Sequence, residues 1–481
     1  MLILSNVKLY KVKQVYLLVL LIGLILRSIN VYSLLPSKYD SLLFAFLAVF
    51  GGLLLMIDFI INVKSRKRPY DILLIIFLVV LLISTIVNRH FGIVSNLKLM
   101  VWSCIYFFIV YEFGEISSQD NHFFKRINYS LIISWFFVSL LSLGMFLLQF
   151  GYEKYTSPRD RIRVGFLESR LFGLFGDPNY GAVICLVVII LSIFYLISEW
   201  RKKGIIKKVF LISNIIIQFP TLLLSGSRSA LLISFAILGV TTFIYGSLFI
   251  GQHFSKNIIV KMVCTSIFTL IVLGAYFVFQ TETKGIFQKI PEHVKYEMRF
   301  ENRKNELQVV KKGNKVKQVK EEVSLVRKDV AQNTDISNMR FSIWKSAIEV
   351  FKTTSFVGTS PRNLIPYAKE KLPNTFIAEQ SFVAHNTFIN VLVSTGCFGF
   401  LAFIIFLVLR GTTAVIFYFK NIKTLPYSYY VYLSSTVALV LSGLFVNELV
   451  LVNTIGTFIF WLYLGKINGY MKGKSKWQNE K

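Results

Sequence analysis

The sequence predicts an all-α polytopic membrane protein of about twelve transmembrane helices, with one large loop between the ninth and tenth. Apolar residue types make up 54% of the 481 residues and charged types only 16%, whereas soluble domains are nearer a quarter charged. The 45 phenylalanines would favour aggregation if they faced water. With only four Cys, ten Pro and 28 Gly, a disulfide scaffold, a disordered chain and a collagen-like repeat are excluded.

Hydrophobic windows of about 20 residues, the length needed to cross a bilayer, recur along the chain. Twelve are found, at 15–35, 41–63, 71–88, 97–114, 128–150, 179–199, 208–225, 227–250, 258–280, 386–409, 427–447 and 449–465. Three lysines precede the first window, and no small-residue cleavage site follows it. This pattern indicates a retained first helix rather than a cleaved signal peptide.

The 53 basic and 25 acidic residues give a net charge of +28. In a soluble protein this excess would suggest nucleic acid, but in a membrane protein it is first tested against the positive-inside rule. With the N-terminus in the cytoplasm, the cytoplasmic segments carry 24 Lys and Arg and the short outer loops nine, five of them within 151–178. This asymmetry predicts twelve spans with both ends inside, and no nucleic-acid partner.

The windows and the long loop divide the chain into four regions. These are an N-terminal transmembrane bundle (1–150), a central transmembrane region (151–280), an extracytoplasmic loop (281–384), and a C-terminal transmembrane region with a basic cytoplasmic tail (385–481). Residues 295–330 of the loop are rich in Lys and Glu. They fit either a hairpin around Gly313-Asn314 or a helical valine stripe, and both alternatives remain open.

The second part of the loop predicts an amphipathic helix near 338–351. Ser337 or Asn338 can cap it, and its predicted apolar face consists of Phe341, Trp344, Ala347, Ile348 and Phe351. Such a helix is suited to lie on the outer surface of the membrane.

Two polar motifs stand at the predicted outer ends of spans. In RLFGLFGDPNYGA (170–182), Asp177-Pro178-Asn179 is typical of a helix cap followed by a first-turn proline, which leaves Arg170 unexplained. In LLLSGSRSALL (222–232), Ser227 can cap the eighth span, which puts Arg228 in its first turn. A cation is unfavourable there, so either Arg228 is an interfacial anchor or an anion binds between the guanidinium and the helix.

Two further residues lie toward the C-terminus. Arg340 opens the helix RFSIW and can also be read as a solvated loop arginine, while His385 and Asn386 stand at the outer entrance of the tenth span. A lone histidine is more often structural than functional, and the other four histidines have no comparable setting.

The predicted topology places Arg170, Arg228, Arg340 and His385 at one depth on the outer face. Three arginines and a histidine at such an interface indicate a site for a phosphate-bearing lipid head group. The planar guanidinium grips phosphate oxygens and stays charged, and imidazole can exchange a proton near neutral pH.

The motifs RLFGLFGDPN, SGSRSALL, RFSIW with FVGTSPRNL, and AHNTFINVLVSTG together resemble the O-antigen ligase and oligosaccharide repeat-unit polymerase superfamily of bacterial envelope enzymes. The resemblance covers about residues 165–410, with the motifs in the family's order. It implies a GT-C-like membrane glycosyltransferase in the bacterial cytoplasmic membrane, with its active site on the extracytoplasmic side.

The resemblance also implies roles for individual residues. Arg228 and Arg340 would hold the diphosphate of an undecaprenyl-linked sugar donor, Arg170 matches a position of less certain role, and His385 would be catalytic. The supporting residues are Asp177, Asn179, Ser227 and Asn386. The family's transfer needs no metal or cofactor, and no DxD pair occurs in the outer loops. GTSPR replaces a glycine-rich turn, which leaves the role of Arg362 open.

Several functions remain compatible with these residues. The favoured one is a polymerase that joins lipid-linked repeat units for a capsule, exopolysaccharide or O-antigen, with a chain-length regulator and a flippase as expected partners. A ligase that transfers a finished glycan uses the same donor chemistry. A flippase or other transporter is the third, although no two-half symmetry is found and the midspan charges are only Arg27 and Asp58. An enzyme that uses Asp40 as its base is a minor fourth alternative.

Overall fold

Each of the twelve hydrophobic windows overlaps a helix in the computed structural model, which describes residues 2–66, 70–155, 161–201, 204–254, 257–289, 325 and 339–479. In these residues nine helices are long and apolar enough to cross a membrane, and Ile72–Val87 is a shorter apolar helix. The protein is therefore a mostly helical, multi-pass membrane protein. The Lys/Glu-rich stretch 295–330, with its hairpin and helix alternatives, lies outside the described residues apart from Leu325.

The chain forms two compact units. Unit 1 consists of Met1–Ser28, Leu35–Leu131 and Asn333–Lys481, and unit 2 of Ile29–Leu34 and Ile132–Gln332. Helix α6 (Asn121–Leu147) contributes to both, because the division falls within it.

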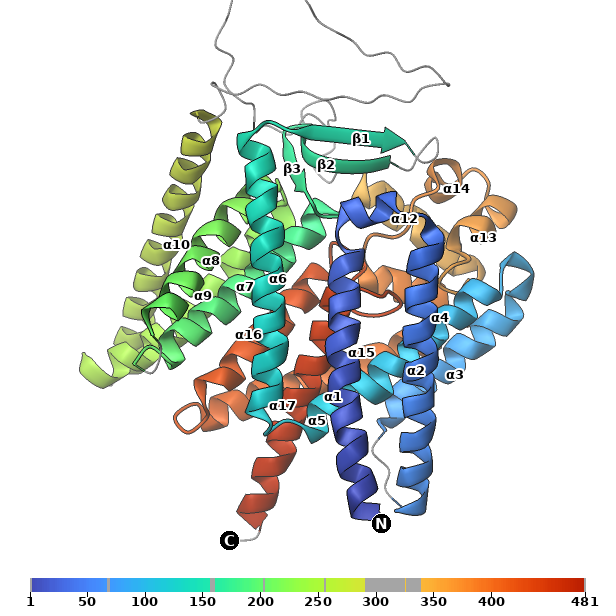
Figure 1. Ribbon diagram of the computed structural model, residues 1–481, viewed down its shortest axis with the longest axis horizontal. Helices are drawn as coiled ribbons and strands as arrows, with labels where there is room; N and C mark the ends of the chain where they lie inside the picture. The colour runs from blue at the N-terminus through green and yellow to red at the C-terminus, as the bar shows by residue number, and fades with distance from the viewer. Residues whose placement is uncertain are drawn as a thin grey trace, which may run out of the picture. The chain divides into compact units, whose positions relative to one another are not determined.

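Unit 1 contains thirteen further elements. They are α1 (Leu2–Arg27), α2 (Ser37–Lys64), α3 (Ile72–Val87), the 3-10 helix η2 (Arg89–Phe91), α4 (Val94–Ile105), the π-helix η3 (Tyr106–Tyr111), α5 (Glu112–Ile116), α12 (Arg340–Thr353), α13 (Leu364–Lys371), α14 (Phe376–Gln380), α15 (Thr387–Asn421), α16 (Tyr427–Ser442) and α17 (Ile455–Asn479). Within this unit, α12 lies at the end where α1 finishes, and the last turn of α17 lies at the end where α1 begins (Figure 1).

Glycines let α5 and α17 pack with their backbones in contact. A Cβ atom added at Gly114 would overlap the carbonyl of Leu462, and one added at Gly465 would overlap the carbonyl of Tyr111. Small residues at helix interfaces allow this close approach in membranes, where packing rather than burial from water drives helix association. The contact fixes the position of α17, which follows the irregular segment 443–454.

Helix α15 is broken at Gly396, whose φ of 65° and ψ of −170° belong to a region that only glycine adopts readily. The break leaves backbone groups without helical partners, and residues 355–360 supply them. Thr359 N–H donates to the carbonyl of Val393 at 2.8 Å, and Ser360 N–H to that of Ser394 at 2.9 Å. The GTSPR motif is thus part of the core of unit 1, because buried backbone groups must be hydrogen-bonded within the protein.

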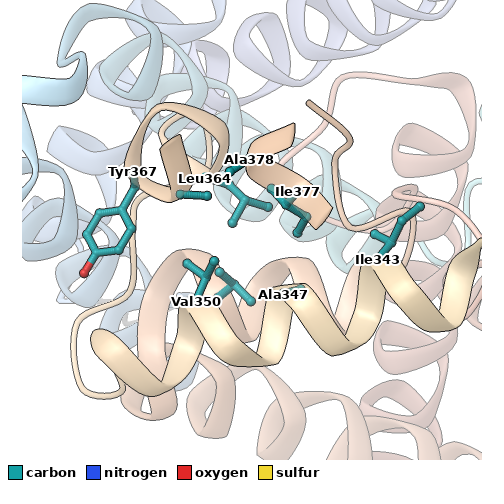
Figure 2. Packing of buried hydrophobic residues seen from close by; sticks show 9 residues of the cluster. Ile343, Ala347, Val350, Leu364, Tyr367, Ile377 and Ala378 are labelled. Carbon is teal, nitrogen blue, oxygen red and sulfur yellow. The ribbon is translucent and has the colours of Figure 1, made fainter. Parts of the chain in front are cut away.

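Helices α12, α13 and α14 form a small hydrophobic cluster that also includes Val393 of α15. Figure 2 shows its core, made of Ile343, Ala347, Val350, Leu364, Tyr367, Ile377 and Ala378. The predicted apolar face of α12 was partly wrong: Phe341 is 68% exposed, whereas Ile343 and Val350 are buried. The buried face of α12 differs from the predicted one because this helix packs against other helices of the protein. Met339, which makes no side-chain cap bond, occupies the N-cap position, and the predicted caps Ser337 and Asn338 lie outside the described residues.

Unit 2 contains a sheet that the all-α prediction missed. Its elements are the 3-10 helix η1 (Asn30–Leu34), strands β1 (Gly151–Tyr155), β2 (Arg161–Leu167) and β3 (Arg170–Gly173), and helices α7 (Pro178–Ser198), α8 (Ile205–Leu224), α9 (Arg228–His253) and α10 (Ile258–Lys289). The strands pair antiparallel in the order β1-β2-β3. Glu168 and Ser169 make a two-residue hairpin turn, and both have positive φ. Such turns usually contain Gly or Asn, so the sequence Glu-Ser gave no signal for a hairpin here.

Ion pairs on this sheet account for basic residues that the charge asymmetry had left in an outer loop. Arg161 pairs with Glu153 at 2.6 Å and with Glu168 at 2.8 Å. Arg163 pairs with Glu168 at 3.1 Å and stacks over the ring of Phe172 at 4.0 Å. Arg161 and Arg163 therefore have acidic partners within the sheet itself.

Several predicted windows differ from the helices that overlap them. Helix α1 ends at Arg27 rather than at 35, and α10 continues to Lys289 rather than ending at 280. The last window was predicted to begin at 449, but α17 begins at Ile455. Hydropathy marks apolar stretches, whereas a helix can continue beyond them or stop within one where polar residues intervene.

Candidate functional site

Asn386 fixes the start of α15. Its side-chain oxygen accepts from the N–H groups of Phe388 at 2.9 Å and Ile389 at 3.1 Å, which satisfies two donors of the first helical turn. Its amide group donates to the carbonyl of Leu444 at 2.9 Å. Asn386 thus joins α15 to the segment that follows α16, and the predicted helix entrance at this position is confirmed.

His385 precedes this cap in a strained backbone conformation. Its φ of 47° lies in the left-handed region, which non-glycine residues occupy only in a few per cent of cases, histidine among the more frequent. The side chain is half-buried, and its ring lies 6.3 Å from that of Phe382. Such strain gathers at functional sites, where the surrounding structure holds it.

Arg340 lies close to the same segment. It is the half-buried first residue of α12, and its guanidinium is 5.5 Å from the centre of the Phe445 ring. One turn later, Trp344 donates its indole N–H to the carbonyl of Ala384 at 3.1 Å. Arg340 and His385, 45 positions apart in sequence, are therefore both attached to one local framework of unit 1.

The segment 443–454 completes this framework, and the sequence analysis missed it. Thr387 N–H donates to the carbonyl of Gly443 at 2.7 Å, and Thr387 Oγ1 accepts from the N–H of Glu448 at 3.0 Å. The Glu448 side chain is fully buried and accepts from the hydroxyl of Ser442. The signal was a glutamate within an apolar run, since an acidic residue at membrane depth is costly and is retained for a reason.

A second group of predicted site residues lies in unit 2 around Arg170. This arginine is only 8% exposed. Its Nε donates to the carbonyl of Ser225, and a terminal nitrogen donates to Asn179 Oδ1, both at 2.9 Å. Arg170 thus holds the start of α7 against the turn that leads into α9.

The two predicted helix caps of unit 2 are confirmed. Asp177 accepts from Asn179 N–H at 2.7 Å with Pro178 at the first helical position, and Ser227 accepts from Ala230 N–H at 3.3 Å. Arg228 is the exposed first residue of α9. Its charge adds to the positive end of the helix dipole, an arrangement that suits an anion.

The structure therefore gathers the predicted residues into two groups. Arg340, His385 and Asn386 lie in unit 1, whereas Arg170, Asp177, Asn179, Ser227 and Arg228 lie in unit 2. Within the described residues, no three His, Cys, Asp or Glu side chains gather in a way that could hold a metal ion.

Residues 214–404 match a family model described as O-antigen ligase. This part of the chain is thus similar to the O-antigen ligase family. The matched region contains Arg228, Arg340, His385 and Asn386, while Arg170 precedes it. The resemblance to the O-antigen ligase and polymerase superfamily is thereby confirmed. No curated protein and no solved structure gives a significant match to the chain.

Proposed function

We propose that this protein is a glycosyltransferase that polymerises undecaprenyl-diphosphate-linked oligosaccharide repeat units on the outer face of the bacterial cytoplasmic membrane. The product would be a capsule, an exopolysaccharide or an O-antigen. The observation that carries the proposal is the strained His385, attached to the same framework as Arg340 within the region similar to the O-antigen ligase family. A flippase that supplies the donor and a chain-length regulator are the expected partners.

In the proposed reaction, an acceptor hydroxyl attacks the anomeric carbon of the donor sugar. His385 takes the hydroxyl proton, the new glycosidic C–O bond forms, and the bond from the anomeric carbon to the diphosphate oxygen breaks. The leaving diphosphate carries the electron pair, so Arg228 and Arg340 would stabilise charge as it develops. Arg170 would act indirectly, by holding the turn before Arg228.

The proposed orientation places the N-terminus in the cytoplasm and α12 on the opposite side. In unit 1, α12 lies at the end opposite the first turn of α1 (Figure 1), as this orientation requires. A single cysteine at Asn314, in a variant without the four native cysteines, should react with a membrane-impermeant maleimide in intact cells. Labelling only after lysis would reverse the orientation.

A ligase is the second candidate, favoured by the description of the matching family. It would use the same donor site but transfer a finished glycan to a different acceptor. The transporter alternative loses support, because its two midspan charges are paired: Asp58 with Lys13 at 2.6 Å and Arg27 with Asp40 at 2.7 Å. Arg27 lies at a helix end rather than at midspan.

The proposal is tested by donor binding and single-turnover transfer in nanodiscs. His385→Ala should bind donor normally but transfer at least about 100-fold more slowly, because a general base acts in the transition state. Arg340→Lys should weaken donor binding, since lysine keeps the charge but loses the two-pronged geometry. Exposed Arg89→Gln serves as the control. Transfer by His385→Ala at the wild-type rate would remove the catalytic residue and with it the proposed function.

A further inference from the structure

Unit 1 contains a cavity of about 990 Å³ between α2 and α4. One end is lined by the charged side chains of Arg27, Asp40, Lys98 and Arg362, and the remainder is largely apolar. Neither Arg340 nor His385 lines it. Its size is at the upper end for ligand sites, and its two ends differ in the way that the head and tail of a lipid differ.

The charged end has an excess of positive charge. Three cations face one carboxylate, and that carboxylate, Asp40, is paired with Arg27 at 2.7 Å. Burial lowers the pKa of Arg362, and the positive charge of Arg27 lowers it further. Two guanidinium groups therefore repel each other in a partly desolvated place, and an anion between them would relieve that repulsion.

Arg362 is held at this position by its backbone. Its N–H donates to Asn96 Oδ1 at 2.9 Å, and Asn96 Nδ2 donates to Asn363 Oδ1 at 3.0 Å. Since residues 359 and 360 of the same segment bond to the broken part of α15, the location of Arg362 is built into the core. This accounts for the arginine of GTSPR, whose role the sequence left open.

The cavity follows α2 from Asp40 at the charged end to Met56 in the apolar part, about 24 Å at 1.5 Å per residue. That length approaches the hydrocarbon thickness of a bilayer, about 30 Å. Ala48 and Gly52 keep the wall of α2 shallow, and a Cβ atom added at Gly52 would meet nothing within 4 Å. A long hydrocarbon chain can therefore lie along α2 with its head at the charged end.

Asn453 connects this cavity to the candidate active site. It lines the cavity and accepts from the hydroxyl of Tyr106, while its Nδ2 has no hydrogen-bond partner in the described part of the chain. Asn453 belongs to segment 443–454, whose first residues contact Asn386 and Arg340. A ligand in the cavity would thus touch the segment that frames His385.

We propose that this cavity binds a second long-chain lipid diphosphate, with the diphosphate at Arg27, Lys98 and Arg362 and the chain between α2 and α4. The net charge of +2 at the head end matches a diphosphate better than the single charge of an ordinary phospholipid. Binding in the cavity does not depend on the proposed function. The role of the bound lipid in the reaction does depend on the proposed function. A polymerase needs a second lipid-linked substrate as acceptor, whereas a ligase does not.

The test is the number of undecaprenyl diphosphate molecules bound per chain, measured by native mass spectrometry and by titration in nanodiscs. The wild type should bind two. Lys98→Gln with Arg362→Gln should weaken one of the two sites at least about tenfold and leave the other unchanged. Arg228→Gln with Arg340→Gln should do the reverse. Exposed Arg89→Gln, which lies outside the cavity, should retain both sites.

A second variant tests the chain-binding part without altering charge. Gly52→Leu should fill the groove and remove one undecaprenyl diphosphate, whereas Gly411→Leu, an equally open helical glycine of unit 1 outside the cavity, should not. A stoichiometry of one that only Arg228 and Arg340 variants abolish would overturn this inference but leave the proposed function intact. Equal displacement by phosphatidylglycerol would also overturn it, in favour of an ordinary bilayer lipid.

Discussion

The indole N–H of Trp344 donates to the carbonyl of Ala384 at 3.1 Å. This bond joins α12, which begins with Arg340, to the residue before His385. Because the backbone of His385 is in the left-handed region, the conformation around it depends on such contacts. Trp344 therefore positions two candidate site residues at once, although it was predicted only as part of an apolar helix face.

Trp344→Phe should remove this bond while keeping an aromatic ring. We expect the free energy of unfolding to fall by about 1 kcal/mol, the usual contribution of one hydrogen bond. The rate of glycan transfer should fall about tenfold. The same substitution at Trp200, which is 49% exposed, is the matched control. Thermal unfolding and transfer assays in detergent would show both effects; unchanged transfer would mean that the bond does not position His385.

Arg228→Gln should separate activity from stability. Arg228 is exposed at the positive end of α9, so its removal should leave the unfolding free energy unchanged or raise it by about 0.3–1 kcal/mol. Transfer should fall at least about 100-fold if the guanidinium binds the leaving diphosphate. A marked loss of thermal stability in this variant would instead indicate a structural anchor.

Arg170→Gln should lower both the stability of the protein and its rate of glycan transfer. It removes charge-assisted bonds to buried Ser225 and half-buried Asn179, so the protein should lose about 2–4 kcal/mol of stability. Transfer should fall because the turn before Arg228 is no longer fixed. Arg163 lies on the neighbouring strand of the same sheet, and Arg163→Gln is the comparison for both stability and transfer. Normal thermal stability of Arg170→Gln would contradict the positioning role.

Gly396→Ala should prevent correct folding. The added Cβ would overlap the backbone of Phe356, and alanine does not adopt this backbone conformation without strain. We expect at least about 3 kcal/mol of destabilisation, seen as loss of monodisperse protein after detergent extraction. Gly411→Ala in the same helix has open space at its Cβ and should extract normally. Normal extraction of both would mean that the break in α15 is dispensable.

Replacement of residues 300–330 by a short Gly/Ser linker should retain measurable transfer. These residues lie outside the resembling motifs, and their charge-rich composition fits a peripheral insertion. In vitro transfer by the purified variant, with its membrane insertion verified, is the measurement. Complete loss of transfer would assign this stretch to the active site.

The positions of the long apolar helices and of two helix caps were predicted from local signals in the sequence. Apolar windows located every long helix, because burial in a bilayer demands some twenty apolar residues in a row. The caps Asp177 and Ser227 were recognisable because capping depends on neighbouring residues. The motif resemblance also held within residues 214–404.

The features that the sequence did not predict depend on contacts between distant parts of the chain. The hairpin turn at Glu168-Ser169 lacks glycine, the broken α15 needs residues 355–360 to satisfy it, and α17 starts late because 443–454 packs against α15. The sequence alone determined the membrane class, the helices and the candidate residues, since hydropathy and capping act locally. Tertiary structure decided which residues meet, and that Arg362 joins Arg27 and Lys98 in one cavity, because packing and backbone hydrogen bonding are satisfied only across the folded chain.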